Sequence, residues 1–263
     1  MNTGAKEEKD RALVRQRYNR ASLTYDVMEW PIERIAFRHW RRALLHNLWG
    51  RVLEVGVGTG KNLPYYDYNK VQLTGVDLSE GMLRRAKALA ARRGFLADLR
   101  QMDAEHLDFP DGTFDAVVHT FVLCSVPHPA EVLREIVRVL KPNGRLLMLE
   151  HVLSQVRHIA RMQQWMDPLT SRMMGAHMDR DTVSAIRLAG FSIVRDEKLM
   201  LEDVFRRLEC RVQPPFSIST TSGGGASQSD QPPGILPFFT ESSLSPCYKE
   251  PTGLITSISA ERT

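Results

Sequence analysis

The chain has 263 residues, of which 43% are hydrophobic, and a formal net charge of +4. Its basic residues are spread along the chain, and no nucleic-acid-binding motif is present. We therefore expect no specific nucleic-acid partner. Three cysteines, Cys124, Cys210 and Cys247, are too few and too scattered for a disulfide framework, and no spacing resembles a metal site. No apolar run approaches the roughly 20 residues that span a bilayer, and the acidic "KEEKD" segment near the start resembles neither a signal peptide nor a transit peptide. We therefore expect a cytoplasmic protein or one peripheral to an intracellular membrane.

The N-terminal part, up to Gly50, has helical periodicity and no strand pattern. One helix is expected around residues 7–19 and another around residues 32–48. The second combines an apolar face with four arginines, namely Arg34, Arg38, Arg41 and Arg42. A helix that packs on the sheet edge and exposes a basic face is favoured, and a helix that lies on a membrane surface is the alternative.

Short apolar runs alternate with helical patterns in the middle of the chain. The expected strands cover residues 52–55, 71–76, 114–122 and 145–150, followed by two more at 191–198 and 205–212. Ser79 is placed to cap one intervening helix, Pro129 begins another, and the sequence "KPNG" is expected to end that helix at Gly144. A further helix is expected around residues 181–189. This order predicts an α/β fold with a doubly wound, mostly parallel sheet.

The composition changes abruptly at Gln213, beyond which serine, threonine, proline and glycine dominate. Such a segment buries too little apolar surface to offset its ordering entropy, so it is predicted to be a disordered tail. We therefore divide the chain into an N-terminal helical cap at residues 1–50, a central domain at 51–212 and a tail at 213–263.

The sequence "VLEVGVGTG" places three glycines, Gly56, Gly58 and Gly60, directly after a predicted strand. Glycines at a turn from strand to helix let the backbone approach a ligand, although a tight turn without a ligand would look the same. The spacing is not that of a dinucleotide fingerprint, and no Walker lysine follows. Asp77 follows the next strand, and Asp103 in "QMDAEHL" is placed at the end of a third strand that lies between residues 76 and 103. One ligand could contact all three strand ends.

Several ordered motifs resemble those of class I S-adenosylmethionine-dependent methyltransferases: "VLEVGVGTG", "LTGVDLS", "MDAEHLDFPDGTFDAVV" and "VLREIVRVLKPNGRLLMLEH". More narrowly, "RYNRASLTYDVMEWPIERIAFRHWRR" and "FVLCSVPHPAEVL" resemble the bacterial enzymes of ubiquinone and menaquinone biosynthesis or phosphatidylethanolamine N-methylation. The resemblance implies a Rossmann-like seven-stranded sheet whose last strand is antiparallel, and S-adenosylmethionine as the cofactor.

The resemblance also implies where the cofactor binds. Its implied contacts are Glu54, Gly56, Gly58 and Gly60 at the methionine end, Asp77 at the ribose, Leu78, Asp103 and Ala104 at the adenine, and His119 or Thr120 beneath the sulfonium. Tyr25 matches an aromatic position that closes over the site, although it could instead pack between the N-terminal helices. His151, after the fifth strand, is the candidate acid or base, with His177 and Asp179 as further candidates.

The expected activity is methyl transfer to a small-molecule or lipid acceptor, through an amine, a phenol or quinol, or a thiol. The acceptor pocket is expected between the N-terminal helices and residues 152–181, which are rich in methionine; an ordinary core is an equal alternative for those methionines. A noncatalytic cofactor-binding subunit of a methyltransferase complex and an NAD-dependent oxidoreductase are the alternative functions. Contact with a membrane surface and the identity of the acceptor stay open.

Overall fold

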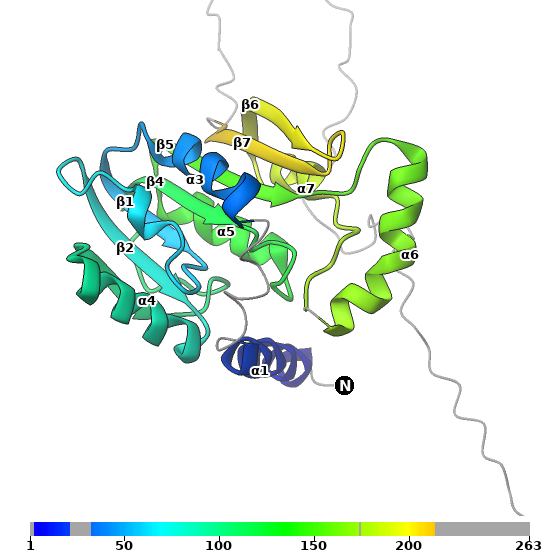
Figure 1. Ribbon diagram of the computed structural model, residues 1–263, viewed down its shortest axis with the longest axis horizontal. Coiled ribbons are helices and arrows are strands. Elements are labelled where there is room, and N and C mark those ends of the chain that lie inside the picture. Colours follow the sequence, from blue (N-terminus) through cyan, green and yellow to red (C-terminus); the bar gives the residue numbers. More distant parts are fainter. Residues whose placement is uncertain (1–2, 22–32, 174, 214–263) are drawn as a thin grey trace, which may run out of the picture. The chain divides into compact units, whose positions relative to one another are not determined.

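The structure is a computed structural model that describes residues 3–21, 33–173 and 175–213. Its core is a seven-stranded sheet in the order β3-β2-β1-β4-β5-β7-β6. The strands are β1 (Gly50–Val55), β2 (Val71–Asp77), β3 (Ala97–Gln101), β4 (Phe114–Thr120), β5 (Leu140–His151), β6 (Phe191–Met200) and β7 (Phe205–Val212). Strand β7, the last in the chain, runs antiparallel to both of its neighbours, β5 and β6, as the resemblance implied. The predicted doubly wound fold is therefore confirmed (Figure 1).

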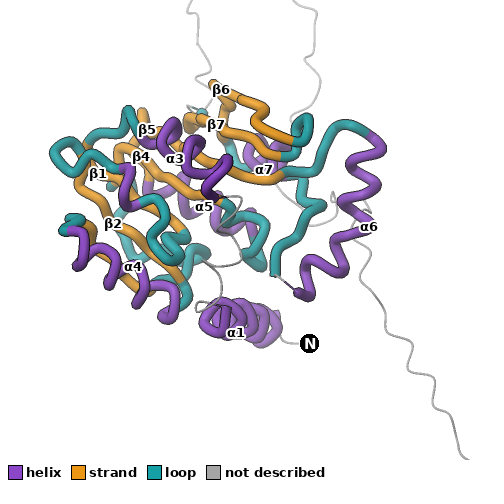
Figure 2. Tube along the Cα trace, viewed as in Figure 1, coloured by secondary structure: helices purple, strands orange, loops and turns teal. Residues whose placement is uncertain are grey.

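The helices lie on both faces of this sheet, because successive side chains of each buried strand point to opposite sides. They are α1 (Thr3–Ala21), α3 (Arg38–Leu45), α4 (Glu80–Arg93), α5 (Pro129–Val139), α6 (Arg157–Met173) and α7 (Thr182–Leu188), with short turns η1 (Glu33–Phe37) and η2 (Leu63–Tyr65). Helices α3 and α4 share one apolar cluster with Val52 of β1, whereas α5 and α7 share another with the next residue, Leu53. Figure 2 shows these two layers on either side of the strands.

Local signals in the sequence account for the ends of two helices. The Ser79 hydroxyl accepts a hydrogen bond from the Met82 amide at 3.2 Å, so it caps α4 as predicted. Pro129 begins α5, also as predicted, but the helix ends at Val139 rather than at Gly144. The segment "KPNG" belongs instead to the start of β5, where the register against β4 jumps from Leu140 to Arg145. The prediction that these residues end the helix is therefore wrong, because they form an irregular part of the following strand instead.

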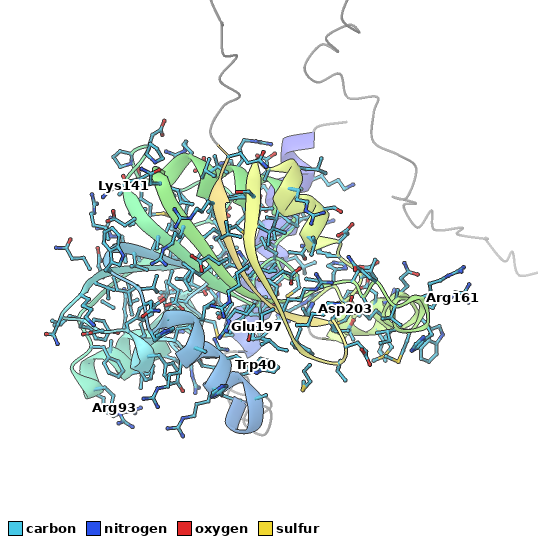
Figure 3. The ribbon with its side chains drawn as sticks, turned by 90° about the horizontal axis from the view of Figure 1, so that it is seen from above. Trp40, Arg93, Lys141, Arg161, Glu197 and Asp203 are labelled. Carbon is cyan, nitrogen blue, oxygen red and sulfur yellow. The ribbon has the colours of Figure 1, made fainter. Side chains whose placement is uncertain are left out.

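The helix expected at residues 32–48 is shorter than predicted and lies on a face of the sheet rather than at its edge. Within the described residues, η1 continues directly into α3, whose Trp40 and Leu44 are buried against the sheet. Figure 3 shows Trp40 extending from this helix. Arg41 is only 4% exposed, which contradicts the expectation that it lies on a solvated basic face.

No helix that the structure describes has both the length and the apolar composition needed to cross a membrane. The predicted tail falls almost wholly on residues 214–263, which lie outside the described residues. The three-part division of the chain therefore stays a prediction.

Candidate functional site

A cavity opens at the carboxyl ends of β1, β2 and β4, beneath helix α1. Strand order reverses between β1 and β4, because β2 and β3 lie on one side of β1 whereas β4 and β5 lie on the other. Ligands of open α/β sheets bind at such a reversal, where the two adjacent connections leave toward opposite faces. The cavity therefore lies where the fold favours a binding site.

The glycine-rich turn contributes backbone to the cavity at Gly56 and Gly58, both of which have positive φ. An added Cβ at Gly56 would lie 2.5 Å from the Cγ2 atom of Val122, so a side chain is excluded there. Gly60 does not line the cavity; its position is crowded by Leu63 and Ala86 instead. The three glycines thus divide between ligand approach and packing against α4.

Asp77 lies at the end of β2 and lines the cavity beside this turn. Its two carboxylate oxygens accept hydrogen bonds from the amides of Gly58 and Ser79, both at 2.8 Å. Burial raises the pKa of Asp77 even though both bonds favour the charged form. Because each carboxylate oxygen has two lone pairs, both retain capacity to accept a further bond from a ligand hydroxyl.

The β3 side of the cavity is lined by Leu78, Met102, Asp103 and Ala104, which include the three residues predicted to meet an adenine. This wall therefore combines apolar side chains with one acidic group. The predicted contacts to the cofactor remain predictions, but the residues lie together along one surface of the cavity.

The β4 side includes Thr120 and Phe121, and the latter has a φ of 58°, unusual for a residue with a side chain. His119 does not line the cavity and is completely buried, with its Nδ1 2.9 Å from Oε1 of Glu150. The same Glu150 oxygen accepts the amide of Val122 at 2.8 Å. Strand alternation thus turns Thr120 toward the cavity and His119 away from it.

Glu54 does not line the cavity either, although it lies one residue before the end of β1. It is 1% exposed, and its carboxylate accepts hydrogen bonds from Asn62 Nδ2 at 2.8 Å and from the Tyr66 hydroxyl at 2.9 Å. Burial raises the pKa of Glu54 to about 7. Its immediate contacts therefore hold the segment that follows the glycine turn.

Arg41 joins this network from α3 and was not predicted to belong to the site. It donates to Asn62 Oδ1 at 2.9 Å, to Thr120 Oγ1 at 2.7 Å and to the carboxylate of Glu33. A signal for its burial was present in the sequence, because Arg41 is four residues from both Phe37 and Leu45 and so shares their buried face. Arg41 thus connects the N-terminal helices to a residue that lines the cavity.

Helix α1 forms the roof of the cavity and is held at several points. The Tyr18 hydroxyl donates to Ser125 Oγ at 2.7 Å, and Asn19 Oδ1 accepts hydrogen bonds from Ser79 Oγ at 2.7 Å and the Gly81 amide at 2.9 Å. Arg11 forms an ion pair with Glu105 at 3.5 Å. Burial raises the pKa of Tyr18, so its hydroxyl stays protonated as the donor. Tyr25 lies outside the described residues, and its predicted role is not tested.

His151 lies at the end of β5, beside the loop that carries Cys124, and does not line the described cavity. Its Nδ1 atom is buried and makes no regular hydrogen bond within the described part of the chain. Burial lowers the pKa of His151, but the neighbouring Cys124 sulfur and Glu150 carboxylate outweigh this effect and raise the pKa to about 9. A raised pKa favours the protonated imidazole, which donates hydrogen bonds rather than accepting a proton.

The other predicted candidates, His177 and Asp179, do not line the cavity and lie close to Asp167 of α6. Ligand atoms of the three residues lie within 4.8 Å of one another. Asp167 already accepts hydrogen bonds from His177 Nδ1 at 3.2 Å and from the Met178 amide at 2.7 Å. These contacts account for the position of Asp167 without a bound cation.

The methionine-rich region was expected to form either an acceptor pocket or ordinary core. Met162, Trp165 and Met166 instead lie on the exposed side of α6. The core alternative is therefore wrong for these three side chains, and the acceptor pocket stays a prediction.

Comparisons with known proteins agree with this geometry. Residues 53–148 match the family model described as "Methyltransferase domain". The ubiquinone/menaquinone biosynthesis C-methyltransferase of Desulfotalea psychrophila is 31% identical over 188 residues, which cover 69% of this chain and 76% of that relative. A phosphatidylethanolamine N-methyltransferase of Cereibacter sphaeroides is 48% identical over 104 residues, or 39% of this chain; the match spans about half of that relative, 51% of its length.

Solved structures show the same fold. A Thermotoga maritima protein described as a SAM-dependent methyltransferase, possible histamine N-methyltransferase, has a TM-score of 0.58 at 22% identity and covers 74% of this chain and 98% of its own. The [4+2]-cyclase SpnF has a TM-score of 0.56 at 21% identity and covers 66% of this chain and 79% of its own. Because a cyclase shares the fold, the architecture alone does not identify a reaction.

Proposed function

Because the chain belongs to the S-adenosylmethionine-dependent methyltransferases, we propose that it transfers the cofactor's methyl group to a small lipid or quinone-like acceptor. The names of the two curated relatives support this acceptor class, since one acts on a phospholipid amine and the other belongs to quinone biosynthesis. The reacting group on the acceptor is an amine, a phenol or quinol, or a thiol.

One observation carries the placement of the cofactor. The exposed backbone of Gly56 and Gly58 and the carboxylate of Asp77 lie together in one cavity. A small polar turn beside an acid suits a molecule that combines charged groups with ribose hydroxyls, and the neighbouring Leu78 and Met102 provide apolar surface for a flat ring. We therefore assign Asp77 to the ribose, Leu78, Asp103 and Ala104 to the adenine, and Thr120 to the region beneath the sulfonium.

Glu54 and His119 act in this proposal through other residues, because neither lines the cavity. Glu54 positions Asn62, whose side chain also donates to Thr120 Oγ1 at 3.2 Å. His119 shares an oxygen of Glu150 with the amide of Val122, so the pair positions the loop after β4. Gly60 permits the close approach of α4.

The bound cofactor supplies an activated methyl group with its leaving group already in place. The protein then needs chiefly to orient the acceptor and exclude water, and well-oriented reactants reach effective molarities of about 10⁵ M or more. The α1 roof suits this task because Tyr18, Asn19 and Arg11 tie it across the cavity. His151, which does not line this cavity, stays a sequence-based candidate for an acid or base near the acceptor, and Tyr25 stays one for closing the site.

Binding of S-adenosylhomocysteine, measured by isothermal titration calorimetry, tests the cofactor assignment. Asp77→Ala removes a hydrogen-bond acceptor from the cavity and is expected to weaken binding by about tenfold to a hundredfold. The control is Asp98→Ala, since Asp98 lies on the neighbouring strand β3 and pairs with Arg100 on the surface. Thermal melting of both variants shows whether the fold is retained. Unchanged affinity in a folded Asp77→Ala variant would refute the ribose assignment.

Catalysis needs a separate test, because a noncatalytic accessory subunit would also bind the cofactor. The purified chain is incubated with methyl-labelled S-adenosylmethionine and a membrane lipid extract, and the extract is searched for labelled product. Product that depends on Asp77 is expected. Tight cofactor binding without any methylated product, across phospholipid and quinol acceptors, would favour the accessory subunit.

A further inference from the structure

Helix α6 exposes a continuous apolar stripe, which we define as Met162, Trp165, Met166 and Leu169. The four side chains are 52%, 82%, 37% and 61% exposed, respectively. Their spacing of three, four and seven residues from Met162 places them on one side of the helix. Figure 1 shows α6 beyond the carboxyl end of β5, away from the stacked helices of the core. A solvated helix of a soluble domain normally presents polar side chains on such a side.

Specific contacts on the opposite side fix the rotation of α6, so the stripe is not exposed by fraying. Buried Gln163 accepts the Ser154 amide at 2.8 Å and donates to the Val152 carbonyl at 2.9 Å. One turn later, Asp167 accepts the Met178 amide at 2.7 Å. These polar anchors hold one side of the helix toward the protein and turn the apolar stripe outward.

The stripe is flanked by positive charge. Arg157, Arg161 and Arg172 are exposed on the same helix, and Figure 3 shows Arg161 at the outer side of α6, away from the sheet. None of the exposed side chains described in α6 is acidic, since its one acid, Asp167, is turned toward His177. An apolar face containing tryptophan, bordered by arginines, is the pattern of a helix that lies in a lipid headgroup region.

We propose that the stripe of α6 docks the protein onto an anionic lipid bilayer. A second copy of the chain is the less suitable occupant, because a twofold contact through the stripe would bring the arginines of both copies together. An anionic surface instead complements them, and the indole of Trp165 suits the boundary between headgroups and acyl chains.

Docking here would also orient the cavity. Arg17 of α1 donates to the Ser171 carbonyl near the end of α6, at 3.2 Å, so the roof of the cavity lies next to the docking helix. This inference deepens the proposed function, because a lipid acceptor would then be taken from the bilayer on that side. Its test needs neither cofactor nor acceptor.

Vesicle sedimentation of the full chain measures the docking directly. The protein is expected to bind vesicles of phosphatidylcholine with phosphatidylglycerol, to bind pure phosphatidylcholine much more weakly, and to be released by salt. Trp165→Ala is expected to weaken binding by about tenfold, since a large apolar side chain no longer enters the interface. Trp49→Ala is the matched control, because Trp49 is 61% exposed but precedes β1, at the other end of the strands from the cavity.

The charge contribution has its own pair of variants. Arg161→Glu is expected to weaken binding to anionic vesicles by at least about fivefold, given the attraction of a single basic side chain to such a surface. Arg93→Glu changes the net charge equally but lies at the end of α4, on a different part of the surface (Figure 3). It is expected to bind as the unmodified protein does.

Three results would overturn the docking proposal. They are equal losses in the α6 variants and their controls, equal binding to neutral and anionic vesicles, and a dimer in sedimentation velocity that Trp165→Ala dissociates. The last result would assign the stripe to a second copy of the chain. Titration with S-adenosylhomocysteine separates this outcome from the proposed function, since Trp165→Ala is expected to retain cofactor affinity whether or not vesicles bind.

Discussion

The buried carboxyl group of Glu54 makes a prediction about stability that can be worked out from the structure. The group is inaccessible to water, and the first cause of its altered pKa is the loss of hydration, which disfavours the charged form. Hydrogen bonds from Asn62 and Tyr66 and the charge of Arg41 offset part of that cost. The pKa of Glu54 is raised from 4.5 to about 7. The change to test is Glu54→Gln, which keeps the shape but cannot ionise.

The sign follows from proton binding. Between pH 4.5 and pH 7 the folded protein holds a proton on Glu54 that the unfolded chain has released, so the free energy of unfolding falls as pH rises through this window. The favourable contribution is complete below the unfolded pKa and is lost once the pH exceeds the folded pKa. For these two pKa values, the loss between about pH 5 and about pH 8 is about 2.5 kcal/mol.

Urea unfolding of the two proteins, measured at several values across that pH range, tests this expectation. The variant is expected to gain about 2.5 kcal/mol relative to the original chain between about pH 5 and about pH 8. Asp77 also has a raised pKa, but it is present in both proteins and cancels from the difference. Glu202→Gln is the control, because Glu202 is exposed in the turn between β6 and β7. A pH-independent difference between the Glu54→Gln variant and the original chain would refute the reasoning.

Three further predictions concern other parts of the chain. Gly56→Ala places a methyl group 2.5 Å from the nearest side-chain carbon at a positive φ, so urea unfolding should show that the free energy of unfolding falls by about 3 kcal/mol. Gly112→Ala also has a positive φ but has open space around it, so it should lose only about 1 kcal/mol. Equal losses would contradict the steric argument. Arg41→Met removes a buried donor to two side-chain oxygen atoms and should lower the free energy of unfolding by about 3 kcal/mol. The matched change at an exposed arginine, Arg42→Met, should cost less than about 0.5 kcal/mol. Similar values for both would mean that the Arg41 contacts contribute little. Truncation after Gln213 should change neither the melting temperature nor the affinity for S-adenosylhomocysteine, and a large drop in either would mean that the removed residues pack against the domain.

Much of the architecture could be predicted because its signals are local. Buried parallel strands appear as short apolar runs, and a capping serine or an N-terminal proline marks a helix whatever surrounds it. The ends of β1 and β2 therefore predict that Gly56, Gly58 and Asp77 lie along the same edge of the sheet. The segment "KPNG" is compatible with two local structures, the end of a helix and an irregular start of a strand. The sequence therefore predicts a turn there but does not decide which element contains it.

Side-chain direction was harder to predict from the sequence. The sequence does not distinguish His119 from Thr120, because they are adjacent, and only the packing of β4 between β1 and β5 decides which one faces the cavity. Arg41 shows the same difficulty in a helix. Its spacing from apolar residues places Arg41 on the apolar face of its helix. A single charged side chain there is normally expected to reach solvent, and the residues that pair with Arg41 lie in distant parts of the sequence.

What the sequence alone determined is the order of helices and strands, the class of the sheet and the turn where a ligand approaches the backbone, because each depends on neighbours within a few residues. Only the tertiary structure brought Arg41, Asn62 and Thr120 together from three separate segments, closed α1 over the cavity through Tyr18, and turned the stripe of α6 outward. These arrangements depend on contacts between residues far apart in the chain, whose free energies are decided by burial and partner geometry rather than by local periodicity.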